Sequence, residues 1–151
     1  VRPGTENVAS IAGFAVACEL AVRALRGRAE RLRVLSERLL AALRAGVPGL
    51  ALNGHESERL PNTINVSFPR ASGSAVLRAA PELAASTGSA YHDGNEAASA
   101  VLLAMGLDEA RALGAVRLSV GAATTAEEID RAGEALVRAW NASSSANRRE
   151  G

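Results

Sequence analysis

Apolar residues recur at steps of three and four residues along the opening part of the chain. The pattern begins after the capping residues Thr5, Glu6 and Asn7, pauses at Gly27 and runs on as far as Gly46. Such spacing places apolar side chains on one face of a helix. We therefore predict a helix, followed by a second one or by its own continuation, whose apolar positions include Val8, Ile11, Phe14, Ala15, Cys18, Val22, Leu25, Leu32, Leu35, Leu39 and Leu43.

Cys18 is the only cysteine, so no disulfide can form within the chain. Its place on the apolar face of the first helical segment predicts a buried structural thiol rather than a reactive one. A chain without a cysteine pair is compatible with a reducing compartment, and we expect a cytoplasmic protein. The arginines of the second segment fall largely on its other side, which predicts a solvated face; they are Arg31, Arg33, Arg38 and Arg44.

Later stretches alternate apolar and polar residues, which is typical of half-buried strands. The clearest cover residues 62–68 and 116–120, and shorter candidates cover 49–53 and 83–85. A capping box over residues 125–128 predicts the start of a last helix. The apolar positions of this helix are Ile129, Leu136, Val137 and Trp140. We therefore predict an α/β fold of the α+β small-domain kind, with a small sheet covered by helices and preceded by a long N-terminal helical segment.

Composition sets further limits on partners and on domain organisation. The net charge of +1 gives no support for a nucleic-acid partner, and no uninterrupted apolar run approaches the roughly 18 residues of a membrane span, so no membrane is expected. We expect a turn and helix over residues 1–26, a compact domain over 27–140 and a disordered tail over 141–151, where serine, asparagine and arginine dominate. Because the chain opens at Val1 without a methionine, we expect a piece of a longer protein.

Arg117 is the strongest chemical candidate among the residues themselves. Strand alternation places Arg117 and Ser119 on one face of residues 116–120, and the apolar side chains on the other. A guanidinium on a half-buried surface usually pairs with a carboxylate. That carboxylate belongs either to a ligand or to an internal salt bridge.

A loop of small residues over 84–94 carries Tyr91 and His92 and is either a functional loop or a plain surface connection. His55 has no histidine, cysteine or carboxylate at metal-ligand spacing, so we expect a surface residue and no metal site. All 17 basic residues are arginine, which a G+C-rich genome would explain. Whatever the cause, this chain has no lysine to form a Schiff base.

Several motifs, in order, resemble the C-terminal portion of the cysteine desulfurases, which belong to the class V aminotransferase group of pyridoxal-phosphate enzymes. The motifs are RPGTENV at 2–8, NGH at 53–55, LPNTINVSF at 60–68, STGSA at 86–90, LAMGL at 103–107, VRLSVG at 116–121, and TT followed by EEID within 124–130. The resemblance implies the C-terminal domain of a fold type I enzyme. Residues 1–26 would link it to a missing large domain that holds the cofactor and the Schiff-base lysine.

The resemblance also implies an activity and partners. Such enzymes are homodimers that convert L-cysteine to L-alanine and keep its sulfur as a persulfide on a mobile loop. A sulfur-acceptor protein then takes the sulfur to iron–sulfur cluster assembly or to tRNA thiolation. Pyridoxal 5'-phosphate is the cofactor of the full-length family, and we expect none bound by this chain alone.

Residue by residue, the resemblance assigns roles to Arg117, Thr5 and position 91. Arg117 matches the arginine that grips the substrate carboxylate, and Thr5 matches a turn that contacts the cofactor phosphate of the neighbouring subunit. The family's nucleophilic cysteine follows Gly-Ser-Ala, where this chain has Tyr91. A tyrosine hydroxyl, with a pKa of about 10, is a hard oxygen nucleophile and cannot replace a thiolate of pKa about 8.5 that must take up sulfur.

These observations lead to one principal hypothesis and two alternatives. The principal one is a cysteine-desulfurase-like domain that is inactive alone, because it lacks the lysine and carries Tyr91. Cys18 lies too far away in sequence to replace the loop thiol, and His92 is either an acid or base or a bystander. The alternatives are a domain of a related pyridoxal-phosphate lyase or transaminase that needs no loop cysteine, and a noncatalytic binding or dimerisation module that keeps Arg117.

Overall fold

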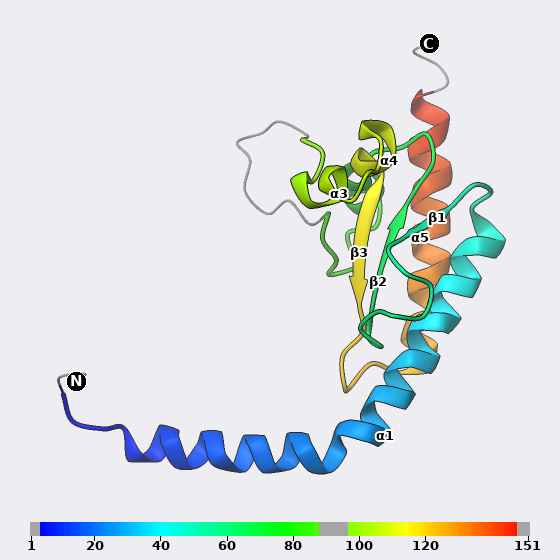
Figure 1. Cartoon of the computed structure of the whole chain (residues 1–151). Coiled ribbons are helices and arrows are strands. Elements are labelled where there is room, and N and C mark those ends of the chain that lie inside the picture. Colours follow the sequence, from blue (N-terminus) through cyan, green and yellow to red (C-terminus); the bar gives the residue numbers. More distant parts are fainter. Residues whose placement is uncertain (1–3, 88–96, 148–151) are drawn as a thin grey trace.

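The computed structural model describes residues 4–87 and 97–147, with the side chains of the last two left out. Figure 1 shows a small antiparallel sheet of order β1-β2-β3, with the long helices α1 and α5 packed together against it. The elements are α1 (Val8–Gly46), β1 (Ala51–Asn53), β2 (Thr63–Ser67), α2 (Gly73–Arg78), α3 (Ala100–Ala104), α4 (Glu109–Leu113), β3 (Ala115–Ser119) and α5 (Ala126–Asn147). The predicted fold class, a small sheet covered by helices behind a long helical segment, is confirmed.

The strand register lines up three polar residues across the sheet. Asn53 of β1 is the Cα partner of Asn65 in β2, and Asn65 is the Cα partner of Arg117 in β3. Successive side chains of a strand point to opposite faces, so all three belong to one face of the sheet. The alternation predicted for β2 and β3 is confirmed, because Val66 and Val116 are fully buried on the other face.

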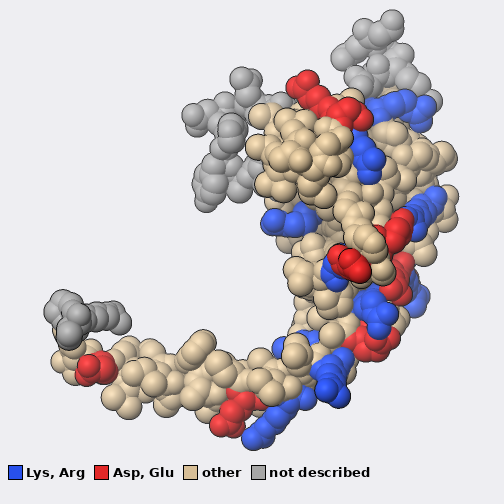
Figure 2. Space-filling model, in the orientation of Figure 1, with Lys and Arg blue, Asp and Glu red and all other residues tan. Residues whose placement is uncertain are grey.

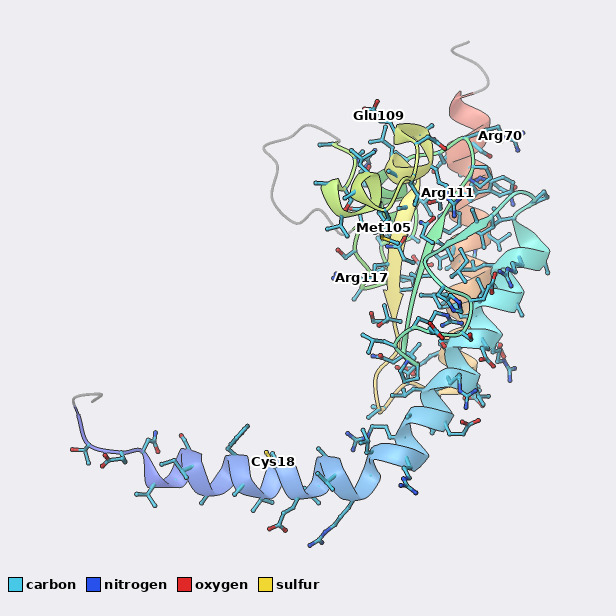
Figure 3. All side chains as sticks on the ribbon, viewed as in Figure 1. Cys18, Arg70, Met105, Glu109, Arg111 and Arg117 are labelled. Carbon is cyan, nitrogen blue, oxygen red and sulfur yellow. The ribbon has the colours of Figure 1, made fainter. Side chains whose placement is uncertain are left out.

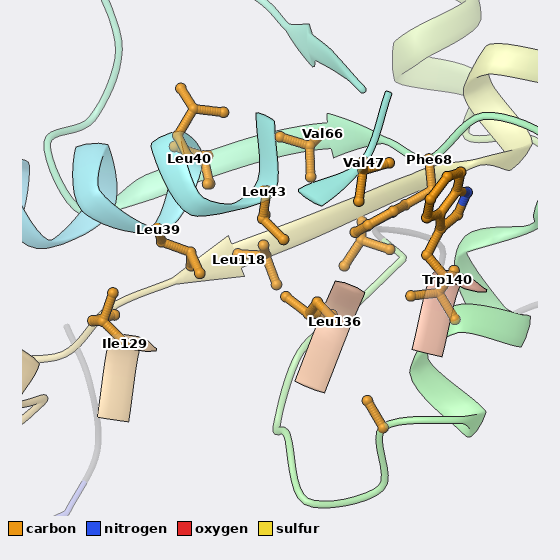
Figure 4. Packing of buried hydrophobic residues seen from close by; sticks show 14 of the residues in the cluster. Leu39, Leu40, Leu43, Val47, Val66, Phe68, Leu118, Ile129, Leu136 and Trp140 are labelled. Atoms are coloured by element: carbon orange, nitrogen blue, oxygen red, sulfur yellow. The ribbon is translucent and has the colours of Figure 1, made fainter. Parts of the chain in front are cut away.

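The core lies between that other face and the two long helices (Figure 4). Both helices contribute a stripe of buried side chains, and the predicted apolar positions of the second half of α1 are confirmed. The residues of the core include Leu39, Leu43, Val66, Phe68, Val116, Leu118, Ile129, Leu136 and Trp140. This packing holds β3, and with it Arg117, in a fixed place.

Trp140 makes one of the polar contacts of the core, and its indole N–H donates to the carbonyl oxygen of Pro69 at 2.8 Å. The Trp140→Phe variant keeps an aromatic ring there but loses the donor and leaves the Pro69 carbonyl unpaired. We expect the free energy of unfolding to fall by about 1–2 kcal/mol, measured by urea denaturation followed by circular dichroism. The exposed Val101→Ala variant should stay within about 0.5 kcal/mol of the parent. Equal stability of Trp140→Phe and the parent would contradict the role of this bond.

The helix α1 continues through Gly27 without a break, so the alternative of one continuous helix is correct. Its start is also as predicted, because the Asn7 side chain accepts a hydrogen bond from the backbone N–H of Ser10 at 3.0 Å. The N-terminal half extends away from the sheet as an arm, and its surface is mostly uncharged (Figures 1 and 2). Large apolar side chains along this arm are exposed: Val8, Ile11, Phe14, Val16, Leu20, Val22 and Leu25.

The hydropathy of this arm contradicts the prediction that no segment is apolar enough to cross a membrane. An 18-residue window of α1 has a mean hydropathy of 1.8, and none of this window is buried. By length and composition alone, the helix is therefore long and apolar enough to cross a membrane. The prediction was wrong because it required an uninterrupted apolar run, whereas the mean hydropathy tolerates interruptions. The core helix of a soluble protein and a signal sequence pass the same test, so the finding is weak evidence for a membrane.

Cys18 is exposed, which contradicts the prediction of a buried thiol. Helical periodicity correctly placed Cys18 beside apolar residues, but it could not report whether anything in the chain covers them. In the described residues nothing packs on the arm at this position. The thiol is therefore accessible in this chain by itself.

The arginines of α1 are exposed, as predicted, but two of them hold the start of α5 to α1. Arg38 forms two hydrogen bonds of 2.7 Å to the Asp130 carboxylate, and the hydrogen bond and charge of Asp130 raise the pKa of Arg38. Arg31 donates to the carbonyl oxygens of Ala122 and Thr124. The predicted capping box is confirmed by reciprocal bonds between the backbone N–H groups and side chains of Thr125 and Glu128.

The predicted disordered tail begins too early, because α5 continues to Asn147. Serine and asparagine favour loops because their side chains compete for backbone groups, but here they bond within the helix. Ser143 and Ser145 donate to the carbonyl oxygens of Ala139 and Asn141, and Ser144 is buried. The remaining residues of that prediction, 148–151, lie outside the described residues.

Residues 83–85 do not form the predicted strand. Only the next residue, Ser86, pairs with β3, as an isolated bridge to Arg117. The backbone N–H of Leu83 instead donates to the carbonyl oxygen of Ala80, which closes a turn after α2. Three small apolar residues were too short a pattern to separate a strand from a loop that meets the sheet at one point.

Candidate functional site

Arg117 lies at the middle of β3 and on the polar face of the sheet, opposite the helices α1 and α5 (Figure 3). Its neighbours Val116 and Leu118 are buried in the core, so strand alternation directs the arginine to the other side. On the same face, the hydroxyls of Ser119 and Thr63 lie 3.0 Å apart. The sequence prediction of this face is confirmed, and it presents an exposed guanidinium on a fixed strand.

The Arg117 guanidinium has no ion-pair partner among the carboxylates that the structure describes. Other arginines of the chain do find partners, such as Arg38 with Asp130 and Arg44 with Glu56. The alternative of an internal salt bridge is therefore not found within residues 4–87 and 97–147. An unpaired guanidinium retains its full set of donors for an anion.

The loop of small residues leaves the sheet directly beside Arg117. The backbone N–H of Arg117 donates to the carbonyl oxygen of Ser86 at 2.6 Å, and the N–H of Ser86 donates back at 3.3 Å. This pair fixes Ser86, the third residue of the loop, at the position of the arginine. Tyr91 and His92, which the sequence singled out farther along the loop, lie outside the described residues.

A polar network beside Arg117 was not predicted from the sequence. Arg111 of α4 donates from Nε to the side-chain oxygen of Asn53 at 2.9 Å and from Nη2 to the carbonyl oxygen of Leu52 at 2.8 Å. The Asn53 amide in turn donates to Asn65 at 2.7 Å and to Ser67 at 2.8 Å. The available signal was asparagine at two strand positions, a residue type that strands disfavour.

Thr5 and Arg117 are not brought together in this chain. Thr5 is exposed just before the N-terminal end of α1, and the arm carries that end away from the sheet (Figure 1). Thr5 precedes the N-cap Asn7 by two residues, and the backbone N–H groups of a helix N-terminus suit an anionic group.

Two other features take no part in this site. His55 is exposed, as predicted, and its Nδ1 accepts from the backbone N–H groups of Ser57 and Glu58, so it stabilises a turn. Within the described part of the chain there is no metal-binding cluster of histidine, cysteine or carboxylates. A hollow of about 730 Å³ between residues 82–85, the end of β3 and α5 is lined by Leu118 and Ser119 but not by Arg117.

Comparison with known proteins decides the family. The family model for class-V aminotransferases matches residues 1–132. The chain belongs to this family. It is 42% identical over 129 residues to the cysteine desulfurase IscS of Anaeromyxobacter sp. (strain Fw109-5), which covers 85% of this chain and 32% of that protein. It is 40% identical over 132 residues to the cysteine desulfurase NifS of Azotobacter vinelandii, covering 86% of this chain and 33% of the relative.

Solved structures agree with the assignment of this chain to the class-V aminotransferases. The NifS-like protein from Rickettsia africae ESF-5 superposes with a TM-score of 0.77 at 28% identity, over 93% of this chain and 37% of that one. The resemblance to cysteine desulfurases is therefore confirmed, and so is the assignment to a domain of fold type I. The chain spans about a third of the length of the curated relatives it matches.

Cysteine desulfurases depend on pyridoxal phosphate, and the residues of this chain do not form a complete site for it. The chain has no lysine to bind the aldehyde. Thr5, which the resemblance assigns to the cofactor phosphate, lies at the end of the arm, apart from Arg117 and the polar sheet face. What the described residues offer is an exposed guanidinium at Arg117, a group whose geometry suits a carboxylate.

Proposed function

We propose that this chain is the small C-terminal domain of a cysteine-desulfurase-like enzyme, and that it supplies the arginine that binds the amino-acid carboxylate. The observation that carries the proposal is the exposed Arg117, which has no ion-pair partner among the described carboxylates and is hydrogen-bonded through its backbone to Ser86 of the small-residue loop. The activity belongs to an assembled protein, since the chain spans only about a third of its relatives.

Arg117 is suited to hold an amino acid in one orientation. A guanidinium donates two parallel hydrogen bonds to a carboxylate, which fixes its plane as well as its position. The backbone of β3 is paired on both sides at this residue, with Asn65 and with Ser86. The substrate carboxylate would therefore be held by a rigid strand.

Alone, the chain is inactive in this proposal. Without lysine it cannot attach the cofactor, and Tyr91 stands at the family's cysteine position. Persulfide formation requires a thiolate whose sulfur attacks the substrate sulfur, so that an S–S bond forms while the C–S bond breaks. A phenol oxygen has no equivalent sulfur chemistry. The presence of Arg117 in a chain that has Tyr91 at the family's cysteine position also favours a second candidate, a related pyridoxal-phosphate lyase or transaminase that needs no loop thiol.

The arm of α1 supplies the proposed partner surface. Its exposed apolar side chains include Ile11, Phe14, Leu20 and Leu25, and contiguous apolar surface of this kind marks an interface. We assign it to the missing large domain and a second subunit of a cytoplasmic homodimer rather than to a membrane, and Thr5 at its end to the cofactor phosphate of that subunit. A sulfur-acceptor protein would be a further partner only where the loop thiol is present.

The test compares the 151-residue chain with the same chain joined to the lysine-bearing large domain of a class-V aminotransferase. We expect the joined protein to retain pyridoxal phosphate through gel filtration and to bind L-cysteine, and the chain alone to retain no pyridoxal phosphate. In the joined protein, Arg117→Ala should weaken L-cysteine binding by about a hundredfold, because a charge-assisted bidentate pair is lost.

The outcomes separate the candidates. Amino-acid turnover without sulfide from the joined protein would favour the lyase or transaminase. A joined protein that folds but retains no pyridoxal phosphate would leave only a noncatalytic module. Unchanged L-cysteine binding in Arg117→Ala would contradict the role assigned to the arginine.

A further inference from the structure

The inference concerns Asn65, which lies beside Arg117 on the polar face of the sheet. The two residues are direct Cα partners across β2 and β3. Side chains opposite each other in an antiparallel pair have Cβ atoms about 4.5–5.5 Å apart. A small anion held by the guanidinium is therefore also within reach of the Asn65 amide.

The hydrogen bonds behind Asn65 decide which end of its amide faces the anion. Arg111 has only donors, and its Nε donates to Oδ1 of Asn53. The Asn53 amide must then present its NH2 group on the other side, where it donates to Oδ1 of Asn65 and to the Ser67 hydroxyl. Turning either amide round would set like groups against each other.

The oxygen of Asn65 is thereby occupied, and its NH2 group is the remaining end. No described residue accepts from that NH2 group. Asn53 is only 6% exposed, so its orientation is held inside the protein rather than by solvent. Arg111 is anchored by a further bond to the Leu52 carbonyl oxygen. The network therefore points a donor, not an acceptor, toward the space beside Arg117.

We propose that Asn65 is a second donor to the carboxylate that Arg117 binds, and that Arg111 and Asn53 are positioning residues that fix its amide. A carboxylate accepts up to about four hydrogen bonds, so two guanidinium N–H groups and one amide N–H fit it together. This rests on the proposed function insofar as the carboxylate is that of an amino-acid substrate. It adds a specificity residue on β2 to the arginine on β3.

The experiment titrates the 15N-labelled 151-residue chain with sodium acetate at ionic strength held constant with sodium chloride. The side-chain NH2 signal of Asn65 and the Nε–H signal of Arg117 should shift together and give one Kd. Asn65→Ala should raise that Kd about tenfold, the usual order for one hydrogen bond to a charged group. Arg117→Ala should abolish saturable binding.

Further variants separate a donor from a merely structural residue. Asn65→Asp still accepts from Asn53 but places a carboxylate beside Arg117, and it should abolish acetate binding while the backbone spectrum is retained. Asn53→Asp no longer donates to Asn65 and should raise the Kd as Asn65→Ala does, although Asn53 does not touch the anion. Ser67→Ala is the matched control, because Ser67 shares the Asn53 donor but is paired with Ala115 instead of Arg117, and its Kd should not change.

The inference is overturned if acetate fails to bind, if the Asn65 side-chain signal stays still while that of Arg117 moves, or if Asn65→Ala binds as tightly as the parent. None of these results depends on the cofactor or on sulfide. Acetate binding through Asn65 combined with a joined protein that retains no pyridoxal phosphate would refute the proposed function and leave the donor in place. Amino-acid turnover by the joined protein, without acetate binding by Asn65, would refute the donor role of Asn65 and leave the proposed function in place.

Discussion

Replacing Tyr91 with cysteine is expected to turn the joined protein from one that releases no sulfide into one that converts L-cysteine to L-alanine and sulfide. The reason is the chemical identity of the nucleophilic atom, since the sulfur of a thiolate accepts sulfur to form a persulfide and the oxygen of a phenol does not. With dithiothreitol present to release the bound sulfur, we expect sulfide at about a hundredfold over background or more. Alanine and sulfide should appear in equal amounts.

Two controls assign the new activity to position 91. Tyr91→Ser has a side chain as small as cysteine but an oxygen nucleophile, and it should remain at background. Cys18→Ser, combined with Tyr91→Cys, should retain the activity, which excludes the exposed Cys18 as the sulfur acceptor. Sulfide from the Tyr91 protein would refute its predicted inactivity. No sulfide from a folded, cofactor-loaded Tyr91→Cys protein would refute the desulfurase ancestry as a guide to function.

The same variant has a pH dependence with a definite sign. A cysteine thiol of ordinary pKa, about 8.5, is mostly protonated at pH 7. Sulfide release by Tyr91→Cys should therefore rise as the pH increases toward about 8.5. A flat profile from pH 7 to 9 would indicate a thiolate already stabilised by its surroundings.

Local patterns were enough to predict the part of the site that lies on β3. Strand alternation depends only on neighbouring residues, so it separated Arg117 from the buried Val116 and Leu118. The capping box at Thr125 and the apolar stripe of α5 are local in the same way. The family resemblance added the roles of Arg117 and position 91, which no periodicity contains.

Contacts between distant parts of the chain were beyond such patterns. Arg111 and Asn53 are 58 residues apart and meet only because α4 lies beside the end of β1. The exposure of Cys18 depended on whether another part of the chain covers the arm, which periodicity does not report. The bonds of Ser143 and Ser145 to carbonyl oxygens four residues earlier are local, but the general preference of serine for loops had outweighed them in the prediction.

Gly73→Ala is expected to cause the largest loss of stability among single-methyl additions to this chain. Gly73 is the first residue of α2 and is buried against β3. A Cβ there would overlap the Ala115 carbonyl oxygen and lie 3.0 Å from the carbonyl carbon and 3.1 Å from a Val116 methyl. Backbone atoms of a central contact cannot turn away as a flexible side chain does. We expect the free energy of unfolding to fall by about 3 kcal/mol.

Gly121→Ala is the matched control, because its added Cβ would meet only the Thr124 hydroxyl at an ordinary 3.7 Å. It should change the free energy of unfolding by less than about 0.5 kcal/mol in the same urea titration. Since Ala115 lies two residues before Arg117 on the same strand, Gly73→Ala should also weaken acetate binding, whereas Gly121→Ala should not. Stability and acetate binding that both stay at the parent's level in Gly73→Ala would show that α2 does not hold β3 in place. The position of Arg117 would then depend on the other contacts of β3, which are its pairing with β2 and Ser86 and its packing against α1 and α5.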